Sequence, residues 1–291
     1  HVFGDRIYIF GSHDQFNGTT FCQNDYVCYS ADTKDLSNWR FEGTIYCKKQ
    51  DPRNRKEEHA MWAPDVAKGP DGRYYLYYCL DYLPQIGVAV CDTPAGQYEF
   101  LDLVRYPDGT PLGEKEGDWI QFDPAILVVE DGSVYLYSGN APMSKKYMLG
   151  KMGYLLTGGE KKSSQVMRLS KDMVTLAQKP QRLLCDVRDS EKTDFYGHEF
   201  FEASSIRKIK NTYYFVYSSV HSHELCYAVS KKPDRDFRFG GTLVDIGDVF
   251  KNGRTEEEAV NCLGNTQGGI ECIDGQWYVF YHRHTNGTQY S

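Results

Sequence analysis

A repeated hairpin constrains the fold of this 291-residue chain more than any other feature of its sequence. Each copy has a turn, an aromatic or β-branched residue, a tyrosine and then alternating apolar positions, and the copies lie at 5–10, 71–78, 131–138, 210–218 and 274–282. Their equivalent tyrosines, spaced by 67, 60, 79 and 64 residues, are Tyr8, Tyr75, Tyr135, Tyr214 and Tyr278. A four-stranded sheet with its loops fits this spacing, so the repeat predicts five sheets.

The predicted sheets form one all-β domain. In the first four units, a second apolar run and a turn follow the hairpin and supply outer strands, and helical periodicity is scarce. We therefore expect a single-domain, five-bladed β-propeller over 1–291, with blades near 1–50, 51–110, 111–190, 191–255 and 256–291. A row of β-sandwich domains is the structural alternative. The fifth unit reaches Ser291 after its second strand, so we expect terminal residues outside this sequence to close that blade.

The composition argues against some classes of binding partner and favours others. A net charge of -7 and a pI of about 5.6 argue against nucleic acid, which requires a basic surface. No apolar run approaches the ~18 residues of a membrane-spanning helix. Twenty-three tyrosines, 15 phenylalanines and 4 tryptophans at a mean hydropathy of -0.57 are typical of a protein that has many short strands or binds sugar rings. A neutral oligosaccharide is the expected partner.

Nine cysteines without any CxxC pair indicate neither a zinc site nor a complete disulfide framework. Several lie within apolar strands, where a free thiol behaves as a small hydrophobic group. Buried free thiols in a reducing compartment, and hence a cytoplasmic location, are the expectation.

The repeat also brings polar residues into register. Asp123 and Glu202 each lie twelve residues before the tyrosine of their own repeat, Asp65 lies ten before and Gln267 eleven before. The strand that precedes each hairpin is the innermost strand of a propeller sheet, so these side chains are predicted to meet at the axis. Converging carboxylates there can bind a divalent cation, or they can share acid and base roles in glycoside cleavage.

Glu202 is the first candidate for a proton donor. Its neighbours Phe200, Phe201 and Ala203 would remove water from an inward-facing carboxyl group and raise its pKa. The alternative is a strand glutamate that faces water or pairs with Arg207. Phe201 and Trp62 could offer flat faces to sugar rings or simply belong to the core.

Glu199 is the rival acid, because a position three residues from Glu202 lies on the opposite face of a regular strand.

Four segments, MWAPDV at 61–66, FDPAI at 122–126, FFEASSIRKI at 200–209 and GQWYVFYHR at 275–283, resemble glycoside hydrolase family 43. The resemblance implies a five-bladed propeller that hydrolyses β-xylosides and α-arabinofuranosides with inversion. It implies an Asp in the first blade as general base, Asp123 as the residue that tunes and orients the acid, and Glu202 as the general acid. Arg283 matches an arginine that contacts the sugar, and an ordinary cross-strand charge is its alternative.

Two departures from the family pattern affect the mechanism. The base of the family precedes the strand that begins here at His1, so we expect it upstream of this sequence. Asp14 is the substitute within the chain, with a rim contact or a turn as its alternative role. Gln267 stands where many relatives have a histidine near a cation or water on the axis. We therefore expect that no cofactor is required, with axial Ca²⁺ as the alternative.

Two histidine groups have spacings that could suit a metal. They are the segment 221–224 and the pair His282 and His284, and at alternate strand positions such residues are more often ordinary face residues. We expect no metal ligands among them.

Three functions are left open by the sequence: an inverting glycosidase that releases xylose or arabinose, a non-catalytic carbohydrate-binding propeller that lacks the base, and a protein-interaction propeller. Carboxylates in register favour the first.

Overall fold

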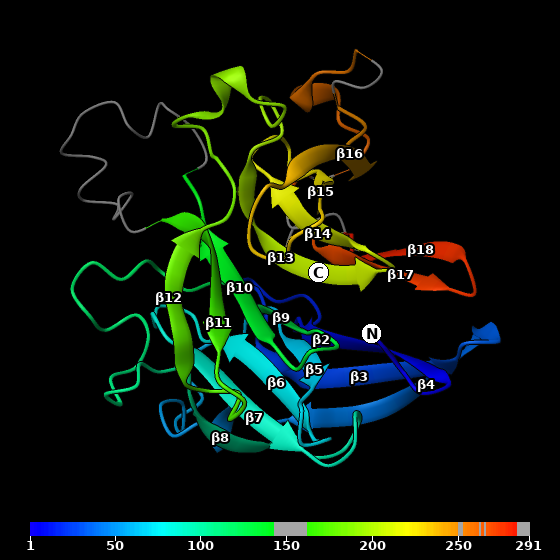
Figure 1. Cartoon of the computed structure of the whole chain (residues 1–291). Helices are drawn as coiled ribbons and strands as arrows, with labels where there is room; N and C mark the ends of the chain where they lie inside the picture. Colours follow the sequence, from blue (N-terminus) through cyan, green and yellow to red (C-terminus); the bar gives the residue numbers. More distant parts are fainter. Residues whose placement is uncertain (143–161, 250–252, 262, 265, 284–291) are drawn as a thin grey trace.

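A computed structural model describes residues 1–142, 162–249, 253–261, 263–264 and 266–283. It contains four four-stranded antiparallel sheets and one two-stranded sheet (Figure 1). The first sheet has the order β1 (Val2–Phe3), β2 (Arg6–His13), β3 (Asn24–Asp32), β4 (Asp35–Tyr46). The second has the order β5 (Asp65–Lys68), β6 (Tyr74–Cys79), β7 (Ile86–Cys91), β8 (Glu99–Leu103).

The remaining sheets continue the same pattern. The third comprises β9 (Ala125–Val128), β10 (Val134–Asn140), β11 (Ser163–Leu169) and β12 (Leu176–Arg182). The fourth comprises β13 (Phe200–Ile209), β14 (Thr212–Ser219), β15 (Leu225–Ser230) and β16 (Arg238–Val244). The two-stranded sheet pairs β17 (Gly268–Ile273) with β18 (Gln276–Tyr281). Short 3₁₀ helices are η1 (Lys48–Gln50), η4 (Ser190–Lys192) and η5 (Glu256–Glu258).

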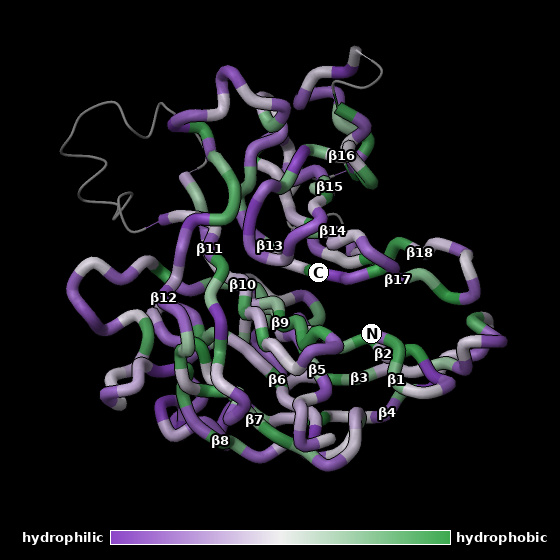
Figure 2. The backbone as a smooth tube through the Cα atoms, in the orientation of Figure 1, coloured by the Kyte–Doolittle hydropathy of each residue, from purple (hydrophilic) through white to green (hydrophobic). Residues whose placement is uncertain are grey.

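Each repeat tyrosine lies on the second strand of its sheet, as the spacing predicts. The five strands concerned are β2, β6, β10, β14 and β18. The period of about one sheet therefore reflects a real structural unit. Strands at different depths differ in composition (Figure 2): the outer strand β12 is largely hydrophilic, whereas the inner strand β9 is apolar.

Apolar clusters join every pair of neighbouring sheets, so the sheets pack in a closed ring. Separate clusters connect the first sheet to the second, the second to the third, the third to the fourth, and the fourth to β17 and β18. A fifth cluster, with Ile7, Ala31 and Ile273, connects β17 and β18 back to the first sheet. This arrangement confirms an all-β propeller with four four-stranded sheets and excludes a row of sandwiches.

The eight described cysteines are free thiols: Cys22, Cys28, Cys47, Cys79, Cys91, Cys185, Cys226 and Cys272. Cys28, Cys79 and Cys226 are buried. Over the described part of the chain, no helix has the length and apolar character needed to cross a membrane.

Candidate active site

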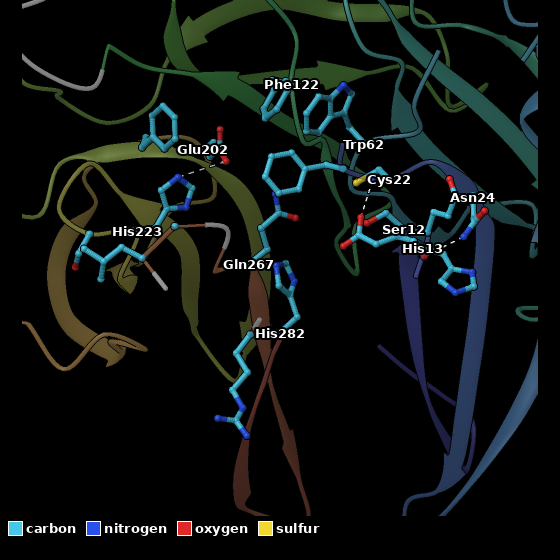
Figure 3. Close-up of a pocket in the computed structure, with 18 of the residues that line it drawn as sticks. Ser12, His13, Cys22, Asn24, Trp62, Phe122, Glu202, His223, Gln267 and His282 are labelled. Atoms are coloured by element: carbon cyan, nitrogen blue, oxygen red, sulfur yellow. Dashed lines mark hydrogen bonds and ion pairs between the residues drawn. The ribbon is translucent and has the colours of Figure 1, made fainter. Parts of the chain in front are cut away.

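A pocket of about 1080 Å³ opens where the sheets converge (Figure 3). Its lining comes from the end of β2, from the segments that precede β5 and β9, from β13, and from residues around β17 and β18. Six predicted site residues line it: Asp14, Trp62, Phe201, Glu202, Gln267 and Arg283. The structure thus brings together side chains that are up to 269 residues apart, from Asp14 to Arg283.

A bulge in β13 aims Glu202 into this pocket. The pairing between β13 and β14 shifts register on both sides of Glu202, and Ala203 adopts a φ of +64°. A bulge bends a strand and redirects one side chain out of the normal alternation, while a positive φ is unusual for a residue with a Cβ atom. The local strain therefore serves to place this carboxyl group.

The surroundings of Glu202 favour its neutral form. Burial raises the pKa of Glu202 well above its usual value, and the nearby charge of Asp123 raises it further. Asn140 Nδ2 donates a hydrogen bond to Glu202 Oε2 at 3.1 Å, which opposes the shift without reversing it. A carboxyl group kept protonated near neutral pH can act as a general acid.

Asp123 precedes β9 instead of lying on it, which corrects the expectation that it belongs to the innermost strand. Its φ is +41° and its side chain is 1% exposed. Burial raises the pKa of Asp123 to about 7, against the opposing effect of the backbone amides of Ala203 and Ala63 and of Gln267. Gln267 Nε2 donates to Asp123 Oδ2 at 2.8 Å. The two acids are electrostatically linked, with Glu202 in the pocket and Asp123 in the adjoining axial cavity.

Asp65 lies apart from the pocket, in an axial cavity of about 540 Å³ that Asp123 and Gln267 also line. Its Oδ1 lies 2.5 Å from His1 Nε2, and its Oδ2 accepts a hydrogen bond from Ile126 N at 2.9 Å. Burial alone would raise the pKa of Asp65, but His1, assisted by Arg207, lowers it. The ionised form of Asp65 is therefore favoured by the contact with His1 and by the charge of Arg207.

The described carboxylates of the axial cavity are engaged with protein groups, which bears on the alternative of an axial Ca²⁺. Ca²⁺ requires six to eight oxygen ligands, most of them free carboxylates and carbonyls. Each described carboxylate of the cavity already has a partner: Asp65 contacts His1, Asp123 accepts from Gln267, and Glu271 pairs with Arg207 at 3.2 Å. The guanidinium group would also repel a cation.

Aromatic side chains form one wall of the pocket. Trp62 packs against Phe122 with ring centroids 5.2 Å apart, and Phe201 meets the ring of His223 edge-on at 4.9 Å. Apolar ring faces beside a pair of acids suit a neutral sugar. Asp14, at the rim, accepts a hydrogen bond from Cys22 N at 2.6 Å, which makes it a loop-stabilising residue as well as a lining one.

Glu199 does not line the pocket. It is 5% exposed and accepts a hydrogen bond from Ser190 Oγ. Its backbone carbonyl accepts from Val220 N at 3.0 Å. The geometry therefore favours Glu202 over Glu199 as the acid.

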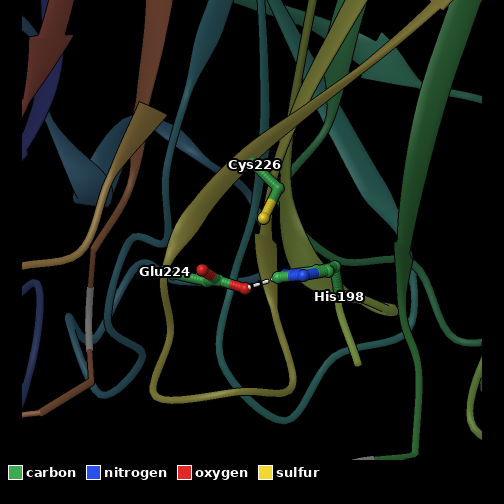
Figure 4. Close-up of side chains that lie close together, drawn as sticks. All are labelled: His198, Glu224 and Cys226. Carbon is green, nitrogen blue, oxygen red and sulfur yellow. Dashed lines mark hydrogen bonds and ion pairs between the residues drawn. The ribbon is translucent and has the colours of Figure 1, made fainter. Parts of the chain in front are cut away.

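The segment 221–224 contributes to a polar cluster of His198, Glu224 and Cys226 (Figure 4). Glu224 is already bonded by His198 Nδ1 and by Thr242 Oγ1, and burial raises the pKa of the Cys226 thiol. A metal would require the thiolate and a free carboxylate, so the cluster is structural. His282 lines the pocket, and His284 lies outside the described residues.

Two residues that contact Glu202 were not identified as site residues from the sequence. Asn140 ends β10 and His223 sits in the turn between β14 and β15, and both contact Glu202. A weak signal exists for Asn140, since the last residues of the second strand in each sheet reach the same depth as the acids. The turn of His223 has no equivalent in the repeat.

The glycosyl hydrolases family 43 pattern matches residues 2–291. A xylosidase/arabinosidase of Thermoclostridium stercorarium is 51% identical over the full chain, and the chain spans 59% of that relative's length. A second, of Bacteroides ovatus, is 30% identical over 97% of this chain and 83% of its own length.

Solved structures agree with the sequence relatives. The structure of an RS223 beta-xylosidase matches with a TM-score of 0.68 and 26% identity, covering 97% of this chain and 84% of that one. A GH43_1 enzyme from Xanthomonas citri complexed with xylotriose matches with a TM-score of 0.70 and 26% identity, covering 97% and 80%. Fold, pocket and sequence all lead to one conclusion: the chain belongs to glycosyl hydrolases family 43.

Proposed function

We propose that the chain hydrolyses glycosidic bonds of xylo- or arabino-oligosaccharides and releases a pentose. The observation that carries the proposal is the buried pair of acids, in which burial and Asp123 keep Glu202 protonated inside an aromatic-walled pocket. The names of the relatives, xylosidase/arabinosidase and beta-xylosidase, support the substrate class. No observation favours a binding-only propeller.

The mechanism is a single displacement. Glu202 donates its proton to the glycosidic oxygen, and the bond between that oxygen and the anomeric carbon breaks. A water activated by a carboxylate on the other face of the ring attacks the same carbon with inversion, which requires the two carboxyl groups to stand ~6.5–9.5 Å apart. Asp123 keeps the acid protonated between turnovers and orients it.

The general base must be a carboxylate on the face of the sugar ring opposite Glu202. Among the described lining residues, the other carboxylates are Asp14 and Glu256. Asp14 already accepts the Cys22 amide, and Glu256 lies on the exposed helix η5. His1 reaches the axial cavity through its contact with Asp65.

The strands β17 and β18 are, in this proposal, the inner half of a fifth sheet of the propeller. Alternate residues of β18 are partly exposed, with 41% for Trp277, 39% for Val279 and 48% for Tyr281. Alternating large apolar residues are typical of a strand face that outer strands and their loops cover.

The decisive experiment follows the product anomer by NMR during hydrolysis of nitrophenyl β-xyloside, nitrophenyl α-arabinofuranoside and arabino-xylo-oligosaccharides. We expect the inverted anomer first, and no release above background by Glu202→Ala, whose fold is checked by circular dichroism. Retention of configuration, or full activity of the folded Glu202→Ala variant, would refute the mechanism. Binding without turnover by the unmodified chain would favour the carbohydrate-binding alternative.

A further inference from the structure

The turn between β14 and β15 presents His223 to the acid. Ser222 and His223 have φ values of +51° and +57°, so two consecutive residues with side chains adopt the left-handed conformation. Such residues are uncommon and persist only where surrounding contacts hold them. The turn is therefore built to keep one particular side chain in place.

Glu224 supplies those contacts. Its carboxylate accepts hydrogen bonds from Ser219 Oγ at 3.2 Å and Thr242 Oγ1 at 2.9 Å, and it pairs with His198 (Figure 4). Its backbone closes the turn, since Glu224 N donates to His221 O at 3.1 Å. The end of the turn is thus anchored to β14, to β16 and to the residue that precedes Glu199.

His223 projects from this anchored turn toward Glu202 (Figure 3). Its Nε2 lies 3.8 Å from Glu202 Oε1, and its side chain is 13% exposed. Phe201 meets the imidazole ring edge-on and limits its rotation. The separation exceeds a hydrogen bond, as is common for catalytic groups before a substrate binds.

The two oxygens of Glu202 have different neighbours. Oε2 accepts a hydrogen bond from the Asn140 amide, and an NH₂ group can donate but cannot accept. The proton of the neutral acid therefore belongs on Oε1, the oxygen that faces His223. Asn140 and His223 together determine which oxygen carries the proton and where it points.

We propose that His223 is a positioning residue for proton donation: it holds the proton-bearing oxygen of Glu202 toward the leaving group. The inference rests on the proposed glycosidase function and adds a specific dependence. A sugar or methoxide leaving group needs the proton, whereas 2,4-dinitrophenolate is stable enough to leave without it. Misplacing the proton must therefore slow only the substrates with poor leaving groups.

The test compares His223→Asn with the unmodified chain on three glycosides of one pentose, with 2,4-dinitrophenol, methanol or a second pentose as leaving group. Asparagine tolerates positive φ but is too short to reach Glu202. We expect kcat/KM to fall roughly 10- to 100-fold on the methyl glycoside and the disaccharide, at or below the lower end of the ~10²–10⁴-fold that a general acid contributes, because the acid itself is still present. On the dinitrophenyl glycoside we expect no significant change.

Two variants sharpen the result. His223→Gln, whose Nε2 can occupy the place of the imidazole Nε2, is expected to recover most of the lost rate. The matched control His221→Asn changes the same residue type in the same turn outside the pocket lining and is expected to behave like the unmodified chain. If His223→Asn fails to fold, His223→Gly, which meets the positive φ with the least strain, replaces it.

An equal fall on all three substrates would overturn the proposal, because it would indicate a general contact with the sugar. Unchanged rates on all three would overturn it as well. A loss on the disaccharide alone, without loss on the methyl glycoside, would assign His223 to the second sugar and also contradict it. Failure of the unmodified chain to cleave any pentoside would instead refute the proposed function itself.

Discussion

Asp65 and Glu202 occupy similar positions in the repeat, yet their surroundings give them opposite charge states. Burial raises the pKa of Glu202, and the electrostatic effect of Asp123 raises it further. Asp65 contacts His1 and lies within the electrostatic influence of Arg207. Together these two residues lower the pKa of Asp65 although burial alone would raise it. Position in the repeat therefore sets the depth of a carboxyl group in the propeller, whereas its contacts with other sheets determine whether it carries a proton.

After Glu202→Ala, the largest effect on activity is expected from Asp123→Asn. The neutral amide removes the charge that raises the pKa of Glu202, so the acid loses its proton at lower pH. We expect kcat/KM on oligosaccharides to fall about 100-fold, within the range for general acid catalysis. In the unmodified chain activity disappears as the pH rises through the raised pKa of Glu202, and in the variant this loss moves to lower pH.

The measurement is a pH profile of kcat/KM for both proteins on one disaccharide. If the variant loses activity at the same alkaline pH as the unmodified chain, Asp123 does not raise the pKa of Glu202, and the proposed role of Asp123 is wrong.

Asp65→Asn is expected to affect stability more than activity. The pKa of Asp65 is lowered in the folded state, so its charge stabilises the fold above the unfolded pKa of about 3.9 and ceases to do so as the pH falls through the folded value. At pH 7 we expect a loss of about 1–3 kcal/mol in the free energy of unfolding by urea, the cost of an unpaired buried group.

The control for Asp65 is Asp108→Asn, which removes an exposed pair with Lys115 and is expected to change stability little. The gap between Asp65→Asn and the unmodified chain should narrow below about pH 4. A large loss of kcat with unchanged stability would show that Asp65, like Glu202, acts in catalysis and not in stabilising the fold.

Asp14→Asn tests the pocket rim. The amide keeps an oxygen for the Cys22 N–H, so the loop should hold. We expect KM to change less than about tenfold and kcat to stay nearly constant, as for the loss of one modest contact. A fall in kcat comparable to that of Asp123→Asn would identify Asp14 as the base.

The smallest expected effect is that of chelation. Dialysis against EDTA should leave both kcat/KM and the urea midpoint unchanged, because the described axial carboxylates have protein partners. A loss of activity that added Ca²⁺ restores would contradict this expectation and would mean that Asp65 and Asp123 bind the ion together.

The repeated sheets and the approximate depth of the acids in the propeller could be predicted from the amino-acid sequence alone. Turn residues, β-branched side chains and a tyrosine in each unit are local signals, and they placed the five second strands and predicted that Asp123 and Glu202 lie near each other, as their electrostatic interaction shows. Offsets from the tyrosine gave only the approximate depth, because Asp123 precedes β9 and a bulge in β13 shifts the register at Glu202. The apolar neighbours of Glu202 also indicated its raised pKa.

The hydrogen-bond and ion-pair partners of those acids, in contrast, depend on the tertiary structure. Burial and charge act through space, so Asp65 was paired with His1, 64 residues away, and Asn140 with Glu202, 62 residues away. Positive φ at Asp123 and Ala203, and the turn that carries His223, depend on contacts from several sheets. No local pattern encodes such contacts, because the free energy that holds a strained backbone comes from residues distant in the chain.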